Sequence, residues 1–226
     1  MTATAILLCA GKGERLRAAV DKALVPLAGR PLFTWSLEAF ERTPAIERIV
    51  VVGPVKRMKE LLAASGLSPR KIVGWTEGGR ERQDSVSRGL QLLPDDTTLV
   101  AIHDCARALV TPELIARVLA DAAQHGGAIA ALPLADTLKR GVLGVIEATV
   151  PRQGLWCAQT PQAFRREWIV AAHAAAAGKA TDDAALVEAL GHRVHLTTGD
   201  PLNIKITTLQ DLDLAEAWLT RTSART

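Results

Sequence analysis

The stretch LLCAGKGERLRAAVDK (Leu7–Lys22) runs from apolar residues into a Gly-x-Gly turn and then into several basic side chains. Glycines directly after a strand let backbone N–H groups approach an anion closely, so the stretch predicts a phosphate-binding turn. It does not match a Walker loop, which requires Gly-x-x-x-x-Gly-Lys-Ser/Thr. It also departs from the dinucleotide-binding loop, because Leu16 stands where that loop has its third glycine. The alternative is a solvated basic turn after the first strand.

Short apolar runs alternate with amphipathic segments along most of the chain. Buried strands are expected at residues 5–10, 48–53, 71–75, 98–104 and 127–133. Helices are expected at 31–42, 55–66, 111–126, 165–177, 182–190 and 208–221, with Thr111 and Gly126 at the two ends of the third. Continuous apolar strands are typical of a parallel sheet that is covered on both faces. The sequence therefore predicts a three-layer, Rossmann-like α/β fold with a mainly parallel sheet.

The alternation stops after Pro133. Residues 137–158 are rich in β-forming residues and contain Gly141 and Gly144, but they hold no helix of useful length. We interpret them as an extended β-arm that projects from the sheet. Since no linker, repeat or low-complexity tract divides the chain, residues 1–226 are expected to form one domain with this arm.

Composition excludes several classes of partner. The net charge of the 226 residues is only +3, and basic residues are interleaved with acidic ones, so we expect no nucleic-acid partner. No apolar run approaches the roughly 20 residues of a membrane span, and no signal peptide is recognised. Cys9, Cys105 and Cys157 are odd in number and lack metal-type spacing, which is typical of reduced thiols in a cytoplasmic protein.

Further motifs follow the glycine turn in a fixed order. They are GGRERQDSVSRGL (78–90), IHDCARALV (102–110), DTLK (136–139), RQGLWCAQTPQAF (152–164), TDDAALVE (181–188) and NIKIT (203–207). Together with AGKGERL and Lys22, they resemble the 2-C-methyl-D-erythritol 4-phosphate cytidylyltransferase family over nearly the whole chain. Departures from the usual pattern, at Asp21, Arg80 and Cys105 among others, leave the charged residues in place.

The resemblance implies a nucleotidyltransferase fold and a specific reaction. In that reaction a phosphate oxygen of 2-C-methyl-D-erythritol 4-phosphate attacks the α-phosphorus of CTP. The products are 4-diphosphocytidyl-2-C-methyl-D-erythritol and pyrophosphate, made within the non-mevalonate isoprenoid pathway. Because both reactants are anions, positioning and charge stabilisation matter more than a general base.

Charged residues at the turn and near the C-terminus are the candidates for charge stabilisation. We expect Arg15, Lys22 and Lys205 to be catalytic, since guanidinium and ammonium groups suit phosphate oxygens. The expected nucleotide-binding residues are Ala10, Gly11, Lys12, Gly13, Glu14, Gly79, Arg82 and Ser85. Lys22 is alternatively a solvated turn residue, and Ser85 is alternatively a cap in the first turn of a helix.

Asp104 ends a predicted strand at the carboxyl edge of the sheet, where open α/β sheets bind ligands. A carboxylate there suits Mg²⁺, although a capping or turn aspartate is the alternative. His103 is expected to be a packed strand residue, and Arg107 to pair with a neighbouring acid.

The acceptor phosphate and its polyol require basic and hydroxyl side chains. The expected substrate-binding residues are Thr137, Arg152, Thr160, Thr181 and Lys205. The resemblance implies a homodimer in which the arm of one subunit supplies Arg152 to the other subunit. Thr181, followed by two aspartates, is also a good helix start.

Three competing functions follow from the same residues. A ribitol 5-phosphate cytidylyltransferase has a closely similar pattern and differs in its polyol. A nucleotide-binding protein without catalysis is possible on the same fold, but it would be expected to lose some of the charged residues. A dinucleotide-dependent oxidoreductase is disfavoured by Leu16 and by the missing downstream acid.

Overall fold

The computed structural model describes residues 1–11 and 22–223. Its centre is a seven-stranded sheet with the strand order β11-β7-β10-β6-β1-β4-β5. These strands are β1 (Ala3–Leu8), β4 (Arg48–Val52), β5 (Ile72–Thr76), β6 (Leu99–Asp104), β7 (Gly127–Pro133), β10 (Trp156–Arg165) and β11 (His195–Thr198). All neighbours pair in parallel except β10, which is antiparallel to both β6 and β7. The prediction of a mainly parallel sheet is therefore confirmed.

The α-helices of the described residues lie within two residues of the predicted ranges, except α3, for which no range was predicted. They are α1 (Leu32–Arg42), α2 (Val55–Ala64), α3 (Arg82–Leu90), α4 (Pro112–His125), α5 (Arg166–Ala175), α6 (Asp183–Ala189) and α7 (Leu209–Ser223). Thr111 caps α4 by accepting a hydrogen bond from the Leu114 N–H, and Gly126 ends it with φ of 89°. Among these helices, none is long and apolar enough to cross a membrane.

Helices cover both faces of the sheet, which accounts for the continuous apolar strands. In β1, Ala5 and Leu7 belong to a core cluster with residues of α1, α2 and α4. Ile6 and Leu8 belong to a second cluster with residues of α3, α5 and α6 on the other face. Since successive side chains of a strand point to opposite faces, both sets must be apolar. The three-layer α/β prediction is confirmed.

Two strands of the sheet were not predicted, β10 and β11. β10 lies between β6 and β7, and its segment from Gln159 to Phe164 is buried although it holds Gln159, Thr160 and Gln162. These polar side chains interrupt the apolar run that marks a buried strand, so the pattern gave no strand signal. β11 adds a four-residue parallel strand beside β7.

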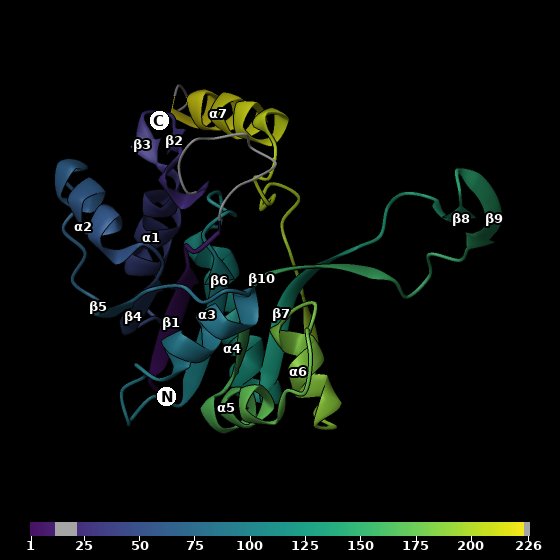
Figure 1. The fold of residues 1–226 in the computed structure, drawn as a ribbon, viewed down its shortest axis with the longest axis horizontal. Coiled ribbons are helices and arrows are strands. Elements are labelled where there is room, and N and C mark those ends of the chain that lie inside the picture. The colour runs from purple at the N-terminus through teal and green to yellow at the C-terminus, as the bar shows by residue number, and fades with distance from the viewer. Residues whose placement is uncertain (12–21, 224–226) are drawn as a thin grey trace.

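Short elements lie outside the main sheet. η2 (Lys22–Leu24) is a 3-10 helix, and β2 (Pro26–Leu27) pairs with β3 (Arg30–Pro31). α7 lies beside this small hairpin (Figure 1), where the Glu216 carboxylate accepts a hydrogen bond from the Ala28 N–H at 2.9 Å. The contact places the C-terminal helix over the start of α1.

A second hairpin consists of β8 (Leu138–Val142) and β9 (Val145–Val150), which pair only with each other. It extends away from the sheet (Figure 1) and turns at Leu143 and Gly144, whose φ angles of 49° and 82° suit a tight hairpin. Apolar side chains remain exposed along it, including Val145 at 69% and Leu143 at 99%. Two strands alone cannot bury their own apolar residues, which accounts for this exposure.

Gly89 permits close packing of α3 on the sheet. A Cβ added there would lie 2.6 Å from Ile6 Cγ2 and 3.1 Å from Val52 Cγ2, both in fully buried side chains. Gly89→Ala is therefore expected to lower the free energy of unfolding by about 1–3 kcal/mol, because overpacking outweighs the gain in helix propensity. Urea denaturation measures this difference. Gly178→Ala is the control, since no atom lies within 4 Å of its added Cβ; equal effects of the two substitutions would contradict the packing argument.

Candidate active site

Asp104 lies at the carboxyl end of β6, where its backbone pairs in register with Leu8 at the end of β1. Asp104 is only 8% exposed, and each of its two carboxylate oxygens has a cationic partner. Oδ1 accepts a hydrogen bond from Arg82 Nε at 3.0 Å, and Oδ2 accepts one from Lys205 Nζ at 2.6 Å. Burial opposes ionisation, but Arg82 and Lys205 hold the pKa of Asp104 well below its usual range. Asp104 is therefore a permanent carboxylate at this edge of the sheet.

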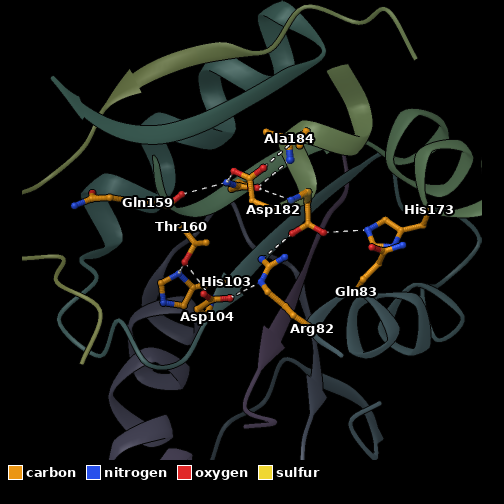
Figure 2. Close-up of polar contacts among 12 residues, drawn as sticks. Arg82, Gln83, His103, Asp104, Gln159, Thr160, His173, Asp182 and Ala184 are labelled. Atoms are coloured by element: carbon orange, nitrogen blue, oxygen red, sulfur yellow. Dashed lines mark hydrogen bonds and ion pairs between the residues drawn. The ribbon is translucent and has the colours of Figure 1, made fainter. Parts of the chain in front are cut away.

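Arg82, the first residue of α3, lies between two carboxylates. Besides Asp104, its Nη2 contacts Asp183 Oδ2 at 2.8 Å. Burial would lower the pKa of Arg82, but Asp183 and Asp104 together raise it above its ordinary value. Figure 2 shows the guanidinium reaching from the helix toward Asp104. The arrangement fixes the direction of a cation that the sequence placed in the nucleotide site.

Gly78 and Gly79 bring the start of α3 against the end of β1. A Cβ on Gly78 would lie 2.2 Å from Ala10 Cβ, and one on Gly79 would lie 2.2 Å from Asp84 Cβ. Only glycine fits at either position, so Ala10, Gly79 and Arg82 are gathered at one site.

Ser85 ties the glycine turn to the helix. Its hydroxyl accepts a hydrogen bond from the Gly79 N–H at 2.9 Å and donates to the Glu81 carbonyl at 3.2 Å. The helix itself is capped by Glu81 and Asp84 in a capping box. The alternative that Ser85 is the helix cap is therefore wrong, and the Gly79 N–H is already engaged within the protein.

Thr160 and His103 form a buried brace behind Asp104. The Thr160 hydroxyl accepts from the Asp104 N–H at 3.1 Å and lies 3.0 Å from His103 Nδ1. His103 Nε2 lies 3.3 Å from the Arg107 carbonyl, which can only accept, so Nε2 carries the proton and Nδ1 accepts from Thr160. Burial lowers the pKa of His103 to about 3. His103 is the packed strand residue that was expected, and the Thr160 hydroxyl has both of its bonds inside the protein.

The segment that carries Lys205 is anchored beside this brace. Asn203 is fully buried, and its Nδ2 donates to the Thr160 carbonyl at 2.8 Å. Arg107 donates from Nη1 to the Asn203 carbonyl at 2.7 Å and from Nη2 to the Ala158 carbonyl at 3.3 Å. Arg107 thus contacts carbonyl groups rather than the acidic partner that was expected, and burial lowers its pKa.

The remaining acceptor-side candidates lie farther along the fold. Thr181 is exposed and precedes Asp182, whose side chain caps α6 by accepting from the Ala185 N–H at 3.0 Å. Thr181 therefore begins the turn before the helix but is not its cap. Thr137 and Arg152 are exposed at the base of the β8–β9 hairpin. Within residues 1–11 and 22–223, no hydrogen bond or ion pair joins these two to Asp104.

The structure describes only some of the predicted site residues of the glycine turn. Lys12, Gly13, Glu14 and Arg15 lie outside the described residues. Gly11 is described and has φ of 156°, a conformation that favours glycine, while Lys22 begins η2. The roles of these residues stay predictions.

Asp104 is the candidate metal ligand. No cluster of three or more His, Cys, Asp or Glu side chains that could hold a metal ion occurs in the described part of the chain. Cys9 and Cys105 lie nearby as buried free thiols with their Sγ atoms 2.7 Å apart, and burial raises the pKa of Cys105 well above its ordinary value. A neutral Cys105 is no metal ligand, so any metal here depends on Asp104 and on oxygens from a substrate.

Sequence reasoning missed two members of the site. Asp183 is 1% exposed and pairs with Arg82, although the sequence indicated only a helix start there. His173 of α5 contacts Asp183 and gave no signal, because it lies in an alanine-rich helical run. Which of these side chains pair with one another depends on the packing of α3, α5 and α6, and no local sequence pattern encodes that packing.

Comparisons with known proteins agree along the whole chain. The family model described as 2-C-methyl-D-erythritol 4-phosphate cytidylyltransferase matches residues 3–221. Enzymes of that name from Gloeobacter violaceus and Shouchella clausii are each 43% identical, over 95% and 97% of this chain and 94% and 97% of their own. The crystal structure of the Thermus thermophilus enzyme superposes with a TM-score of 0.79 at 36% identity, covering 96% of this chain and 98% of that one.

His103 makes stability depend on pH. An unfolded imidazole binds a proton below about pH 6.5, whereas the buried ring does so only below about pH 3. Between these two pH values the unfolded state therefore binds more protons than the folded state. The free energy of unfolding is expected to fall as the pH drops, by about 1.4 kcal/mol per pH unit. Asp104 adds its own loss only below about pH 4, where an unfolded aspartate protonates.

Denaturant unfolding between about pH 4.5 and pH 6.5 measures the slope in the native chain and in His103→Gln, which cannot titrate there. The slope should be smaller in the variant. Replacing the exposed His125 by glutamine controls for the loss of an imidazole elsewhere. Identical slopes in the native chain and His103→Gln would contradict the assignment of a neutral buried ring.

Proposed function

The chain belongs to the 2-C-methyl-D-erythritol 4-phosphate cytidylyltransferase family, and from that premise we propose how its residues join CTP and 2-C-methyl-D-erythritol 4-phosphate. The products are 4-diphosphocytidyl-2-C-methyl-D-erythritol and pyrophosphate, and the reaction serves isoprenoid biosynthesis. The main support for this proposal is that residues from motifs far apart in the sequence meet at one place in the fold. Arg82, Asp104, Thr160, Asp183 and Lys205 come from separate motifs and meet at the carboxyl ends of β1 and β6.

The reaction brings two anions together. A phosphate oxygen of the polyol phosphate bonds to the α-phosphorus of CTP, and the bond to the pyrophosphate oxygen breaks. The residues that oppose this repulsion are Arg15, Lys22 and Lys205, whose charges spread the negative charge that gathers at the α-phosphorus. Lys205 suits the role because its side chain is 43% exposed and its ammonium group is held at the end of β6 by Asp104.

The nucleotide lies against the end of β1 and the start of α3. Backbone N–H groups from Ala10 to Glu14 receive the phosphates, as glycine turns after a strand do. Arg82 forms the wall beside Asp104, and Ser85 holds the Gly78–Gly79 turn in its close approach to Ala10. A short, rigid turn here leaves room for a pyrimidine and excludes a larger base.

Asp104 is the proposed ligand of Mg²⁺. The fit rests on donor chemistry: it is a carboxylate that stays ionised at the ligand-binding edge of the sheet. Magnesium in phosphate sites commonly takes one or two carboxylates and completes its shell with phosphate oxygens and water. When bound, the ion would neutralise phosphate charge. Each Asp104 oxygen also accepts a hydrogen bond, Oδ1 from Arg82 and Oδ2 from Lys205, so the ion would use a remaining lone pair of the same carboxylate.

The acceptor is held by Thr137, Arg152, Thr181 and Lys205, while Thr160, predicted to bind it as well, instead supports Asp104 from behind. We propose that Arg152 acts across a homodimer, delivered by the arm formed by residues 137–158. Support comes from the β8–β9 hairpin, which exposes Val142, Leu143, Val145 and Ile146 and has no partner strand among the described residues. A second copy of the chain is the simplest partner, because a two-fold arrangement buries both arms at once.

Three free cysteines support a cytoplasmic location.

Pyrophosphate release tests the reaction. With CTP and Mg²⁺, turnover is expected with 2-C-methyl-D-erythritol 4-phosphate and far less with ribitol 5-phosphate. Adding a chelator should abolish turnover if the metal is required. Turnover with ribitol 5-phosphate alone would retain the chemistry and overturn the substrate. Binding of CTP without turnover on either acceptor would instead support a binding protein.

Mixed dimers test the shared site. Lys22→Ala and Arg152→Ala are each expected to be nearly inactive as homodimers. When two differently tagged variants are combined and the mixed dimers purified, one of the two sites contains both native residues. Activity should then return to about half that of the native chain. The control is a mixed-tag dimer of Lys22→Ala with itself; no recovery in verified mixed dimers, or a monomeric native chain, would contradict the proposal.

A further inference from the structure

The direction of Arg82 depends on a second carboxylate, which is buried. Asp183 of α6 is 1% exposed, and its Oδ2 lies 2.8 Å from Arg82 Nη2. This contact is an ion pair by distance, but neither atom makes an aligned hydrogen bond within the described residues. An ion pair with weak angular preference does not by itself fix the carboxylate. The other oxygen of Asp183 therefore decides how the carboxylate faces Arg82.

His173 of α5 holds that other oxygen. Its Nε2 lies 3.0 Å from Asp183 Oδ1, and because a carboxylate only accepts, Nε2 carries the proton and donates. The imidazole is 4% exposed. Its Nδ1 lies 3.2 Å from Ser87 Oγ, which also lies 3.1 Å from the Gln83 carbonyl. Nε2 is thus held by Asp183, while Nδ1 faces Ser87, whose single hydroxyl proton can go either to Nδ1 or to the Gln83 carbonyl.

The contacts form a closed loop through three helices. Ser87 lies on α3, the helix that begins with Arg82, while His173 lies on α5 and Asp183 on α6. Figure 2 shows His173 on the opposite side of the ion-pair network from Asp104. A rotation of the Asp183 carboxylate would move Arg82 relative to Asp104, because the guanidinium bridges the two carboxylates.

We propose that His173 is a positioning residue for the nucleotide site, acting through Asp183 to hold Arg82 against Asp104. The inference rests on the proposed function, in which Arg82 lines the CTP site. His173 touches neither Asp104 nor Lys205 and takes no part in the chemical step. Its effect should therefore appear in the affinity for CTP rather than in the affinity for the acceptor.

Removing the imidazole leaves a buried carboxylate oxygen without its donor. Such an oxygen keeps its desolvation cost, so Asp183 is expected to turn toward other donors and to release Arg82. In His173→Ala, the Kd for CTP measured by titration calorimetry with Mg²⁺ should rise about tenfold, equivalent to about 1.4 kcal/mol at 25 °C. His173→Gln retains an N–H donor and should recover most of this affinity. The KM for the acceptor should stay within about twofold in both variants.

Ile169→Ala is the matched control, because Ile169 is a fully buried residue of the same helix and belongs to the second core cluster. It loosens α5 without touching Asp183 through a polar contact. If Ile169→Ala weakens CTP binding as much as His173→Ala at a temperature where both are folded, or if His173→Gln shows no recovery, the positioning role is wrong.

A second background tests the path through Arg82. Arg82→Lys keeps a cation but removes the planar fork that bridges the two carboxylates. The effect of His173→Ala on the Kd for CTP should then shrink to less than about twofold. An undiminished effect would show that His173 acts by another route. If the native chain binds CTP but releases no pyrophosphate, the proposed reaction fails, while these affinities still decide the role of His173.

Discussion

The buried carboxylate of Asp104 is the constraint on which the rest of the site depends. A carboxylate at 8% exposure requires cations, and the chain supplies Arg82 and Lys205 from segments that are 22 and 101 residues away. Arg82 in turn requires a second carboxylate, because a guanidinium next to one acid in a half-buried site is only partly paired. Asp183 fills this place and draws α6 and α5 toward α3. One buried charge at the end of β6 therefore fixes the relative positions of three helices and of the segment around Asn203.

The sequence predicted the fold well where apolar pattern and burial coincide. β1, β4, β6 and β7 are continuous apolar runs, and each lies within two residues of its predicted place. β10 was not predicted because three of its central residues, Gln159, Thr160 and Gln162, have polar side chains whose partners lie elsewhere in the chain. Gln162, for example, bonds to Asp182 and to the backbone of α6. A strand that is stabilised by distant hydrogen bonds has no local periodicity for sequence analysis to detect.

For the candidate site too, the sequence predicted some features and missed others. Sequence analysis selected Arg82, Asp104 and Lys205 and assigned Asp104 to a metal from its place at a strand end, but it did not predict that Arg82 and Lys205 both bond to Asp104. Asp183 was interpreted only as part of a helix start, and Ser85 as a nucleotide contact or a helix cap, whereas in the structure they link helices and turns. Local patterns describe how each segment begins and ends; the hydrogen-bond partner of a buried polar atom is a property of the packed fold.

The charges of this cluster also explain how an acidic residue can stand in a site for two anions. Asp104 and Asp183 contribute two negative charges, while Arg82, Lys205 and Arg107 contribute three positive ones. His103 adds none, because burial keeps its pKa at about 3 and the ring stays neutral. Counted over these five residues, one positive charge is left in excess of the carboxylates. Arg107, which donates to carbonyl groups rather than to a carboxylate, carries that excess. The carboxylates orient the cations without cancelling their attraction for phosphate, and this separation of roles lets a buried, rigid network face a highly charged substrate.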